Sequence, residues 1–184
     1  MEDLLDYAIL PAGPGDAGDL GRVHVKSWRE TYPGIIPQAA LDRMSAPAHA
    51  RRFRHDLMEA KEGQSILIAE GAEGVVGYAA GATLPTTRRG GPARGADAEV
   101  FTLYVLRQAQ GAGVGRALLA ASARVLKAQG AGSLMLFVLT RNERARGFYE
   151  RMGGEAFAEV ASHGWGEGLT ETAYRWADIG VLAG

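Results

Sequence analysis

Three glycines at alternate positions, Gly111, Gly113 and Gly115, follow an apolar segment at 100–106 and precede a segment with an apolar helical face. Glycine lets a backbone turn without Cβ clashes and brings consecutive amides close to a ligand. A helix that follows directs its positive end toward the same point. The spacing therefore predicts a strand, an anion-binding turn and a helix in succession, and the chemistry it indicates is diphosphate binding.

Two other glycine-rich anion sites do not fit this stretch. The dinucleotide fingerprint requires glycine or alanine where the chain has Arg116 or Leu118, and no carboxylate occurs between Glu99 and Glu143 to bind a ribose. A P-loop requires lysine and a hydroxyl residue where the chain has Arg116 followed by alanine. The sequence thus excludes both of these nucleotide-binding motifs.

Charge is unevenly distributed along the chain. The net charge of the 184 residues is −1, yet positions 88–151 carry 11 basic and 4 acidic residues. These basic residues do not alternate with aromatic residues, which favours a polyphosphate small molecule over nucleic acid as the partner. A solvated basic surface is the alternative explanation.

Cysteine is absent, which excludes disulfides, thiolate metal sites and a cysteinyl-enzyme intermediate. The histidines show no metal-ligand spacing: His49 and His55 fall on different sides of a predicted helix, and His24 and His163 stand alone. Satisfied surface or core histidines explain all four. We therefore expect no metal. The chain has no run of about 18 apolar residues and no apolar leader, which predicts a soluble, cytoplasmic protein without membrane contact.

Hydrophobic periodicity predicts alternating strands and helices. The segments 114–129 and 134–139 form, with the strand before them, a strand–helix–strand unit, which implies a parallel crossover. The fold class is therefore α/β. The expected strands are 7–10, 65–69, 75–80, 100–106, 134–139, 155–160 and 171–176; the expected helices begin at 16 and span 47–61, 114–129 and 142–152; the expected long loop is 83–97.

Two motifs carry a resemblance to a known family. Gln110-x-x-Gly113-x-Gly115 matches an acyl-CoA signature, and Asn142-x-x-Ala145-x-x-Phe148-Tyr149 follows at the matching distance. Across about 65–154 the chain resembles the GNAT superfamily of N-acetyltransferases. The resemblance implies a single GNAT-like domain over 1–184, with a mixed central sheet of about six to seven strands flanked by helices.

The resemblance also implies the partners: acetyl-CoA as co-substrate and an amine acceptor. The sequence does not fix the oligomeric state, and a homodimer is compatible with it. Backbone groups of three strand residues and amides of the glycine turn would hold the pantetheine arm and the diphosphate, and three residues of the second motif would flank the thioester. The residues implied are Leu103, Tyr104, Val105, Gln110, Gly111, Ala112, Gly113, Val114, Gly115, Arg116, Asn142, Phe148 and Tyr149.

Two residues are predicted to be catalytic. An alkylammonium with a pKa near 10.4 must lose a proton before it attacks a thioester. Glu99 occupies the position of the general base of GNAT histone acetyltransferases and would act directly or through water; the alternative is a solvated glutamate at a strand edge. Tyr149 matches the tyrosine that stabilises the departing sulfur; the alternative is an aromatic residue of the core.

Trp28 and Tyr32 are the predicted substrate-binding residues. Their segment is similar to a Trp-Arg-x-x-Tyr-x-Gly stretch of bacterial GNAT proteins, in which the first helices wall the acceptor pocket; core packing is the alternative. We expect that pocket between Trp28–Tyr32 and Glu99, under the loop 83–97, whose arginines would suit an amine carrying a carboxylate. The predicted function is acyl transfer by direct attack of an amine, and the alternative is a non-catalytic acyl-CoA sensor.

Overall fold

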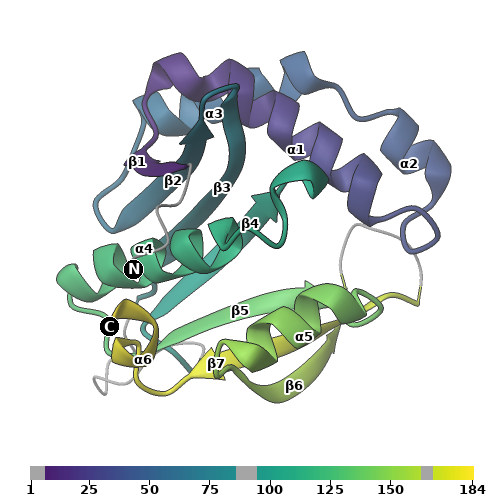
Figure 1. Ribbon diagram of the computed structural model, residues 1–184. Coiled ribbons are helices and arrows are strands. Elements are labelled where there is room, and N and C mark those ends of the chain that lie inside the picture. Colours follow the sequence, from purple (N-terminus) through teal and green to yellow (C-terminus); the bar gives the residue numbers. More distant parts are fainter. Residues whose placement is uncertain (1–6, 86–94, 163–167) are drawn as a thin grey trace.

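The computed structural model describes residues 7–85, 95–162 and 168–184. Its framework is a seven-stranded mixed sheet in the order β1-β2-β3-β4-β5-β7-β6 (Figure 1). This confirms the predicted α/β class and strand number. The strands are β1 (Ala8–Pro11), β2 (Gln64–Gly71), β3 (Gly74–Thr83), β4 (Ala98–Val105), β5 (Leu134–Leu139), β6 (Glu155–Ala161) and β7 (Thr170–Trp176).

Helices cover both faces of the sheet (Figure 1). On one face, Leu20 and Val23 pack with Tyr78 of β3, and on the other, Leu118 packs with Val76. Two short helices were not predicted, because four or five residues are too few to show a helical period. The α-helices are α1 (Ala17–Thr31), α2 (Gln38–Asp42), α3 (Ala46–Met58), α4 (Val114–Ala128), α5 (Glu143–Arg151) and α6 (Gly180–Ala183), and the 3-10 helices are η1 (Pro14–Asp16) and η2 (Arg107–Ala109).

Strands β4 and β5 are parallel, as the crossover implied, but they pair only at their beginnings. The register joins Ala98 to Leu134 and Glu99 to Met135, and beyond these pairs the strands diverge (Figure 1). On its other side β4 pairs with β3, and the register shifts so that Phe101 is left between two paired positions. A bulge of this kind bends its strand. The sheet is therefore open between β4 and β5.

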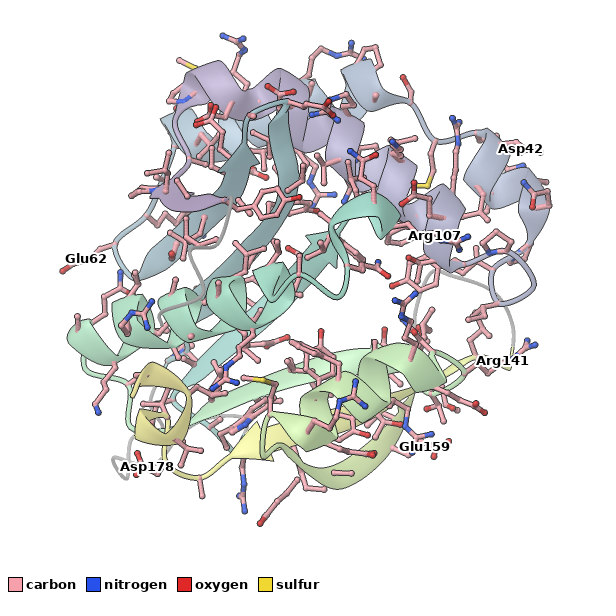
Figure 2. The ribbon with its side chains drawn as sticks, viewed as in Figure 1. Asp42, Glu62, Arg107, Arg141, Glu159 and Asp178 are labelled. Atoms are coloured by element: carbon pink, nitrogen blue, oxygen red, sulfur yellow. The ribbon has the colours of Figure 1, made fainter. Side chains whose placement is uncertain are left out.

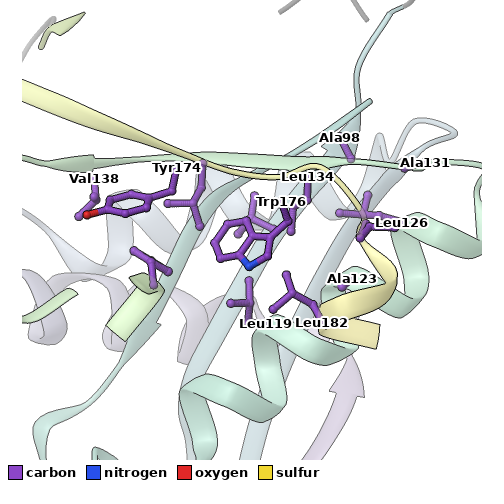
Figure 3. Close-up of a cluster of buried hydrophobic side chains, with 14 residues drawn as sticks. Ala98, Leu119, Ala123, Leu126, Ala131, Leu134, Val138, Tyr174, Trp176 and Leu182 are labelled. Atoms are coloured by element: carbon purple, nitrogen blue, oxygen red, sulfur yellow. The ribbon is translucent and has the colours of Figure 1, made fainter. Parts of the chain in front are cut away.

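A core cluster fixes α5 and β7 beside this opening (Figure 3). It joins Leu119 and Leu126 of α4 to Leu134 of β5 and Trp176 of β7. The indole Nε1 of Trp176 donates to the carbonyl oxygen of Met152 at 2.9 Å, just after α5. The core cluster thus packs tightly where β4 and β5 begin and are paired, whereas strand pairing does not close the rest of the opening.

Candidate active site

The divergence of β4 from β5 opens a cavity of about 850 Å³. What we call the strand half lies between the two strands and reaches the glycine turn, residues 110–116. What we call the helix half lies between the sheet and the helices α1 and α3. Leu103, Tyr104 and Val105 of β4 line the cavity where the two halves meet. One continuous cavity therefore joins the predicted anion site to the predicted acceptor side.

The glycine turn has a backbone conformation that side chains disfavour. The φ angles of Gly111 and Gly113 are 86° and 79°, in the left-handed region. Gly113 is the N-cap of α4, so the unsatisfied amides of a 15-residue helix follow it directly. Gly111, Gly113, Gly115 and Arg116 all line the strand half. Helix amides and a cationic side chain thus border the cavity together, as an anion site requires.

Two contacts hold this turn against the rest of the site. The side-chain amide of Gln110 donates to the carbonyl oxygen of Val105 at 2.8 Å and so ties the turn to the end of β4. A Cβ at Gly115 would lie 3.5 Å from the ring of Phe148. Gly115 and Phe148 thus lie close together, and the residues of both motifs face the same space.

Helix α5 begins at the cap that the sequence predicted. The side-chain oxygen of Asn142 accepts a hydrogen bond from the amide of Ala145 at 3.2 Å. Asn142, Phe148 and Tyr149 all line the cavity. The second motif thus lies across the strand half from the end of β4.

Most of the predicted cofactor-binding residues are brought together by this geometry. Two are not in the lining: Val114 is buried in the core beside Leu118, and Ala112 is exposed outside the cavity. Either could contribute only its backbone amide. The predicted residues that line the cavity are Leu103, Tyr104, Val105, Gln110, Gly111, Gly113, Gly115, Arg116, Asn142, Phe148 and Tyr149.

Tyr149 lines the cavity and also belongs to the core cluster, so its position is compatible with both interpretations, and its catalytic role stays a prediction. Its ring lies 5.2 Å from that of Phe148 and 5.9 Å from that of Tyr174, measured between centroids. Burial, and then the nearby Tyr32, raise the pKa of its phenol above the usual value. The group is therefore a neutral hydrogen-bond donor at every pH at which the protein would be assayed.

Glu99 is not brought into the cavity. It is 8% exposed, stands at the start of β4 opposite Met135, and is not among the lining residues. Its neighbours Ala98 and Val100 pack in the core cluster under α4, so alternation along the strand directs Glu99 to the opposite face. A part for Glu99 in catalysis stays a prediction.

Trp28 and Tyr32 wall the helix half and are also buried in a core cluster. Their ring centroids lie 4.9 Å apart, and the phenol oxygens of Tyr32 and Tyr104 lie 3.4 Å apart. These aromatic residues thus pack in the core and line the cavity as well, and their part in binding an acceptor stays a prediction. The acceptor pocket was also expected to include the arginines at 88, 89 and 94, which lie outside the described residues.

His24 is a buried histidine with a hydrogen-bond partner, as expected of a satisfied core histidine. Its Nδ1 lies 2.6 Å from the phenol oxygen of Tyr78, and its ring lies 4.3 Å from that of His49, which α3 brings over α1. Both histidines line the helix half, together with Arg52 and Phe53. Sequence reasoning missed these residues. Only His24 had a signal, because it precedes Trp28 by four residues and so shares its helical face.

Acid is expected to destabilise the protein through His24. Burial first, and then the charges of His49 and Arg52, lower the pKa of His24 from 6.5 to about 3. Below pH 6.5 the unfolded chain therefore binds a proton that the folded chain does not, so stability present above pH 6.5 is lost toward pH 3. At pH 4.5 the loss is about 3 kcal/mol.

Denaturant unfolding at pH 7 and pH 4.5 measures this loss of unfolding free energy. His24→Asn should remove about 3 kcal/mol of the pH-dependent change in unfolding free energy, whereas the exposed His55→Asn should leave the change as it is. Equal losses of stability in the parent and in His24→Asn would contradict the assignment.

The comparisons with known proteins agree with this site. The model of the acetyltransferase (GNAT) family matches residues 25–154. The uncharacterized N-acetyltransferase YuaI of Bacillus subtilis is 30% identical over 168 residues, which cover 91% of each chain. PaiA N-acetyltransferase of Thermoplasma acidophilum, solved with coenzyme A, superposes with a TM-score of 0.73 at 17% identity, over 92% of this chain and 97% of that one. YncA of Salmonella typhimurium, solved with acetyl-CoA, gives 0.67 at 17% identity, over 94% of each chain.

The match to the family model and the relatives named as N-acetyltransferases place the chain in the N-acetyltransferase class of enzyme. The chain belongs to the acetyltransferase (GNAT) family. Its residues fit the co-substrate of that family, because the glycine turn suits a diphosphate and the slot between β4 and β5 suits an extended arm. In the described part of the chain, three or more potential metal ligands do not cluster anywhere, and none of the helices there has the length and apolar character to cross a membrane.

Proposed function

We propose that the protein transfers an acetyl group from acetyl-CoA to a primary amine of a small molecule or a peptide, by direct attack of the amine. The observation that carries the proposal is the continuous cavity, which runs from the glycine turn past Leu103–Val105 to the aromatic helix half. A thioester lying against β4 would meet an amine that enters from the helix half. Relatives named as N-acetyltransferases and similar folds solved with coenzyme A or acetyl-CoA support the same assignment.

In this proposal the glycine turn supplies most of the binding energy for the co-substrate. A hydrogen bond to a charged group contributes about 1.5 to 3 kcal/mol. A few amides of residues 111–116 bonded to a diphosphate, with Arg116 nearby, would therefore account for micromolar affinity, which corresponds to about 8 kcal/mol.

Acetyl-CoA supplies an activated thioester carbonyl when it is bound. The amine nitrogen forms a bond to that carbonyl carbon, and the carbon–sulfur bond breaks. Tyr149 donates a hydrogen bond to the departing sulfur, which is the role that its neutral phenol allows. Glu99 does not line the cavity, so it could reach the proton of the amine only through water.

The test measures release of coenzyme A from acetyl-CoA, with and without a panel of alkylamines, arylalkylamines, amino acids and peptides. We expect release that depends on one class of amine, with an equal amount of N-acetylated product by mass spectrometry. Binding of acetyl-CoA without amine-dependent release would instead support the non-catalytic sensor.

Trp28→Phe is expected to raise the acceptor KM by about tenfold, because a smaller ring leaves a gap in the wall of the helix half; that factor corresponds to about 1.4 kcal/mol. The affinity for acetyl-CoA should not change. Trp176→Phe is the matched control, since Trp176 is a buried indole of the core that does not line the cavity. Steady-state kinetics with the best amine measure both, and an acceptor KM that is equal in parent and Trp28→Phe would place the acceptor elsewhere.

A further inference from the structure

The helix half contains an imidazole pair that the proposed function does not use. His24 on α1 and His49 on α3 both line the cavity, and their rings are 4.3 Å apart at an interplanar angle of 33°. The helices can approach this closely because residue 21, one turn before His24, is glycine. A Cβ at Gly21 would lie 2.5 Å from the carbonyl oxygen of Ala46 and 2.7 Å from the amide nitrogen of Ala50.

His24 is fixed in place and cannot take up a proton near neutral pH. Burial raises the pKa of the Tyr78 phenol above its usual value, so this phenol keeps its proton, and a hydrogen bond of 2.6 Å joins its oxygen to Nδ1 of His24. Burial also holds the pKa of His24 at about 3. His24 thus forms a neutral, rigid surface against which the ring of His49 packs.

His49 differs from His24 because it is only partly buried. Burial and then the charge of Arg52 lower its pKa below the usual value, so the ring is unprotonated and can accept a proton at neutral pH. Arg52 and Asp56 form a long ion pair of 3.9 Å with exposed side chains. The titratable or charged groups around the pair are His24 from α1, Arg52 and Asp56 from α3, Tyr78 from β3 and Tyr104 from β4.

We propose that His49 accepts the proton that the acceptor amine loses before attack, and that His24 and Tyr78 are positioning residues for it. The inference rests on the proposed function and names the base of that site. The proton moves from the ammonium nitrogen to the free ring nitrogen of His49, the nitrogen lone pair then attacks the thioester carbonyl, and the imidazolium releases its proton to solvent. No other reactant is needed.

The surroundings favour this transfer. The same burial that disfavours a charged imidazole at position 24 disfavours an alkylammonium in the helix half and so lowers the pKa of the bound amine. The ordinary pKa of an imidazole is also closer to the pKa of an amine than the ordinary pKa of a carboxylate is, by about two units. His49 lines the cavity, whereas Glu99 does not.

The test is the pH dependence of kcat/KM for the best amine, measured for the parent, His49→Gln and Glu99→Gln, with the exposed His55→Gln of the same helix as control. We expect the parent profile to fall on the acid side, below the ordinary imidazole pKa of about 6.5, as His49 is protonated, and not to fall on the alkaline side, where the amine is already neutral. In His49→Gln the rate should fall by about 10²- to 10⁴-fold and rise steadily toward the pKa of the amine, because only the neutral amine then reacts. His55→Gln should resemble the parent.

Two further measurements separate catalysis from folding. Acetyl-CoA affinity and the midpoint of thermal unfolding should be unchanged in His49→Gln, and added imidazole should restore part of the activity of His49→Ala. A parent-like rate and profile in His49→Gln, or loss of the acid limb in Glu99→Gln alone, would overturn the inference while leaving the proposed function in place. A parent that acetylates no amine would overturn both.

Discussion

Gly113→Asp is expected to abolish acetyl-CoA binding while the fold persists. Gly113 has a φ of 79° and is the N-cap of α4, so its backbone is placed where the helix amides begin. Aspartate adds a negative charge at the point where a diphosphate would meet those amides. Aspartate adopts the left-handed conformation more readily than most residues, so the helix should still form.

Gly113→Asn separates charge from shape. Asparagine has nearly the same size and the same tolerance of positive φ, but it is neutral. Calorimetric titration with acetyl-CoA should show a loss of more than about 100-fold for Gly113→Asp, since at least one charge-assisted hydrogen bond is replaced by repulsion. The loss for Gly113→Asn should be much smaller. Thermal unfolding confirms folding, and parent-like affinity in a folded Gly113→Asp variant would show that the turn does not hold the diphosphate.

The strand half of the site could be predicted from sequence because its pattern is local. Gln110 to Arg116 are consecutive, and glycine spacing directly reports the backbone conformation that the turn requires. The cap at Asn142 is local in the same way. The nearness of Gly115 to Phe148 is different, because it joins two segments that are far apart in the sequence.

The helix half could not be predicted in the same way. His24, His49 and Tyr78 come from two helices and a strand, and they meet only because α1 and α3 cross on one face of the sheet. No spacing within a single segment reports that crossing. A lone histidine on a helix is usually explained by its own surroundings, so the pairing became visible only with the tertiary structure.

The position of Glu99 shows a different limit. Its distance from the glycine turn can be counted, but the bulge at Phe101 resets the alternation of side chains along β4. Without the bulge, Glu99 would share a face with Leu103 and Val105; with it, Ala98 and Val100 occupy that face instead. A count of residues therefore predicts the place of Glu99 along the strand but not the direction of its side chain.

Tyr149→Phe is expected to lower kcat by about ten- to a thousandfold, the scale of one transition-state hydrogen bond lost. The phenylalanine ring keeps the contacts with Phe148 and Tyr174, so stability and acetyl-CoA affinity should change little. The pKa of Tyr149 is raised, and its proton therefore persists beyond the usual range. Loss of the Tyr149 proton should therefore not lower kcat of the parent below about pH 10, and the pH profiles of the parent and Tyr149→Phe should have the same shape there.

Tyr174→Phe provides the matched control for this prediction. Tyr174 is a second phenol of the same core; its hydroxyl donates to Glu150 at 2.6 Å, and it does not line the cavity. Its loss should reduce the unfolding free energy by about 1.5 to 3 kcal/mol, the range for a hydrogen bond to a charged group, without a comparable effect on kcat. If instead kcat in Tyr149→Phe stays within about twofold of the parent, or falls no further than in Tyr174→Phe, Tyr149 acts by packing alone and the departing sulfur is stabilised by another group.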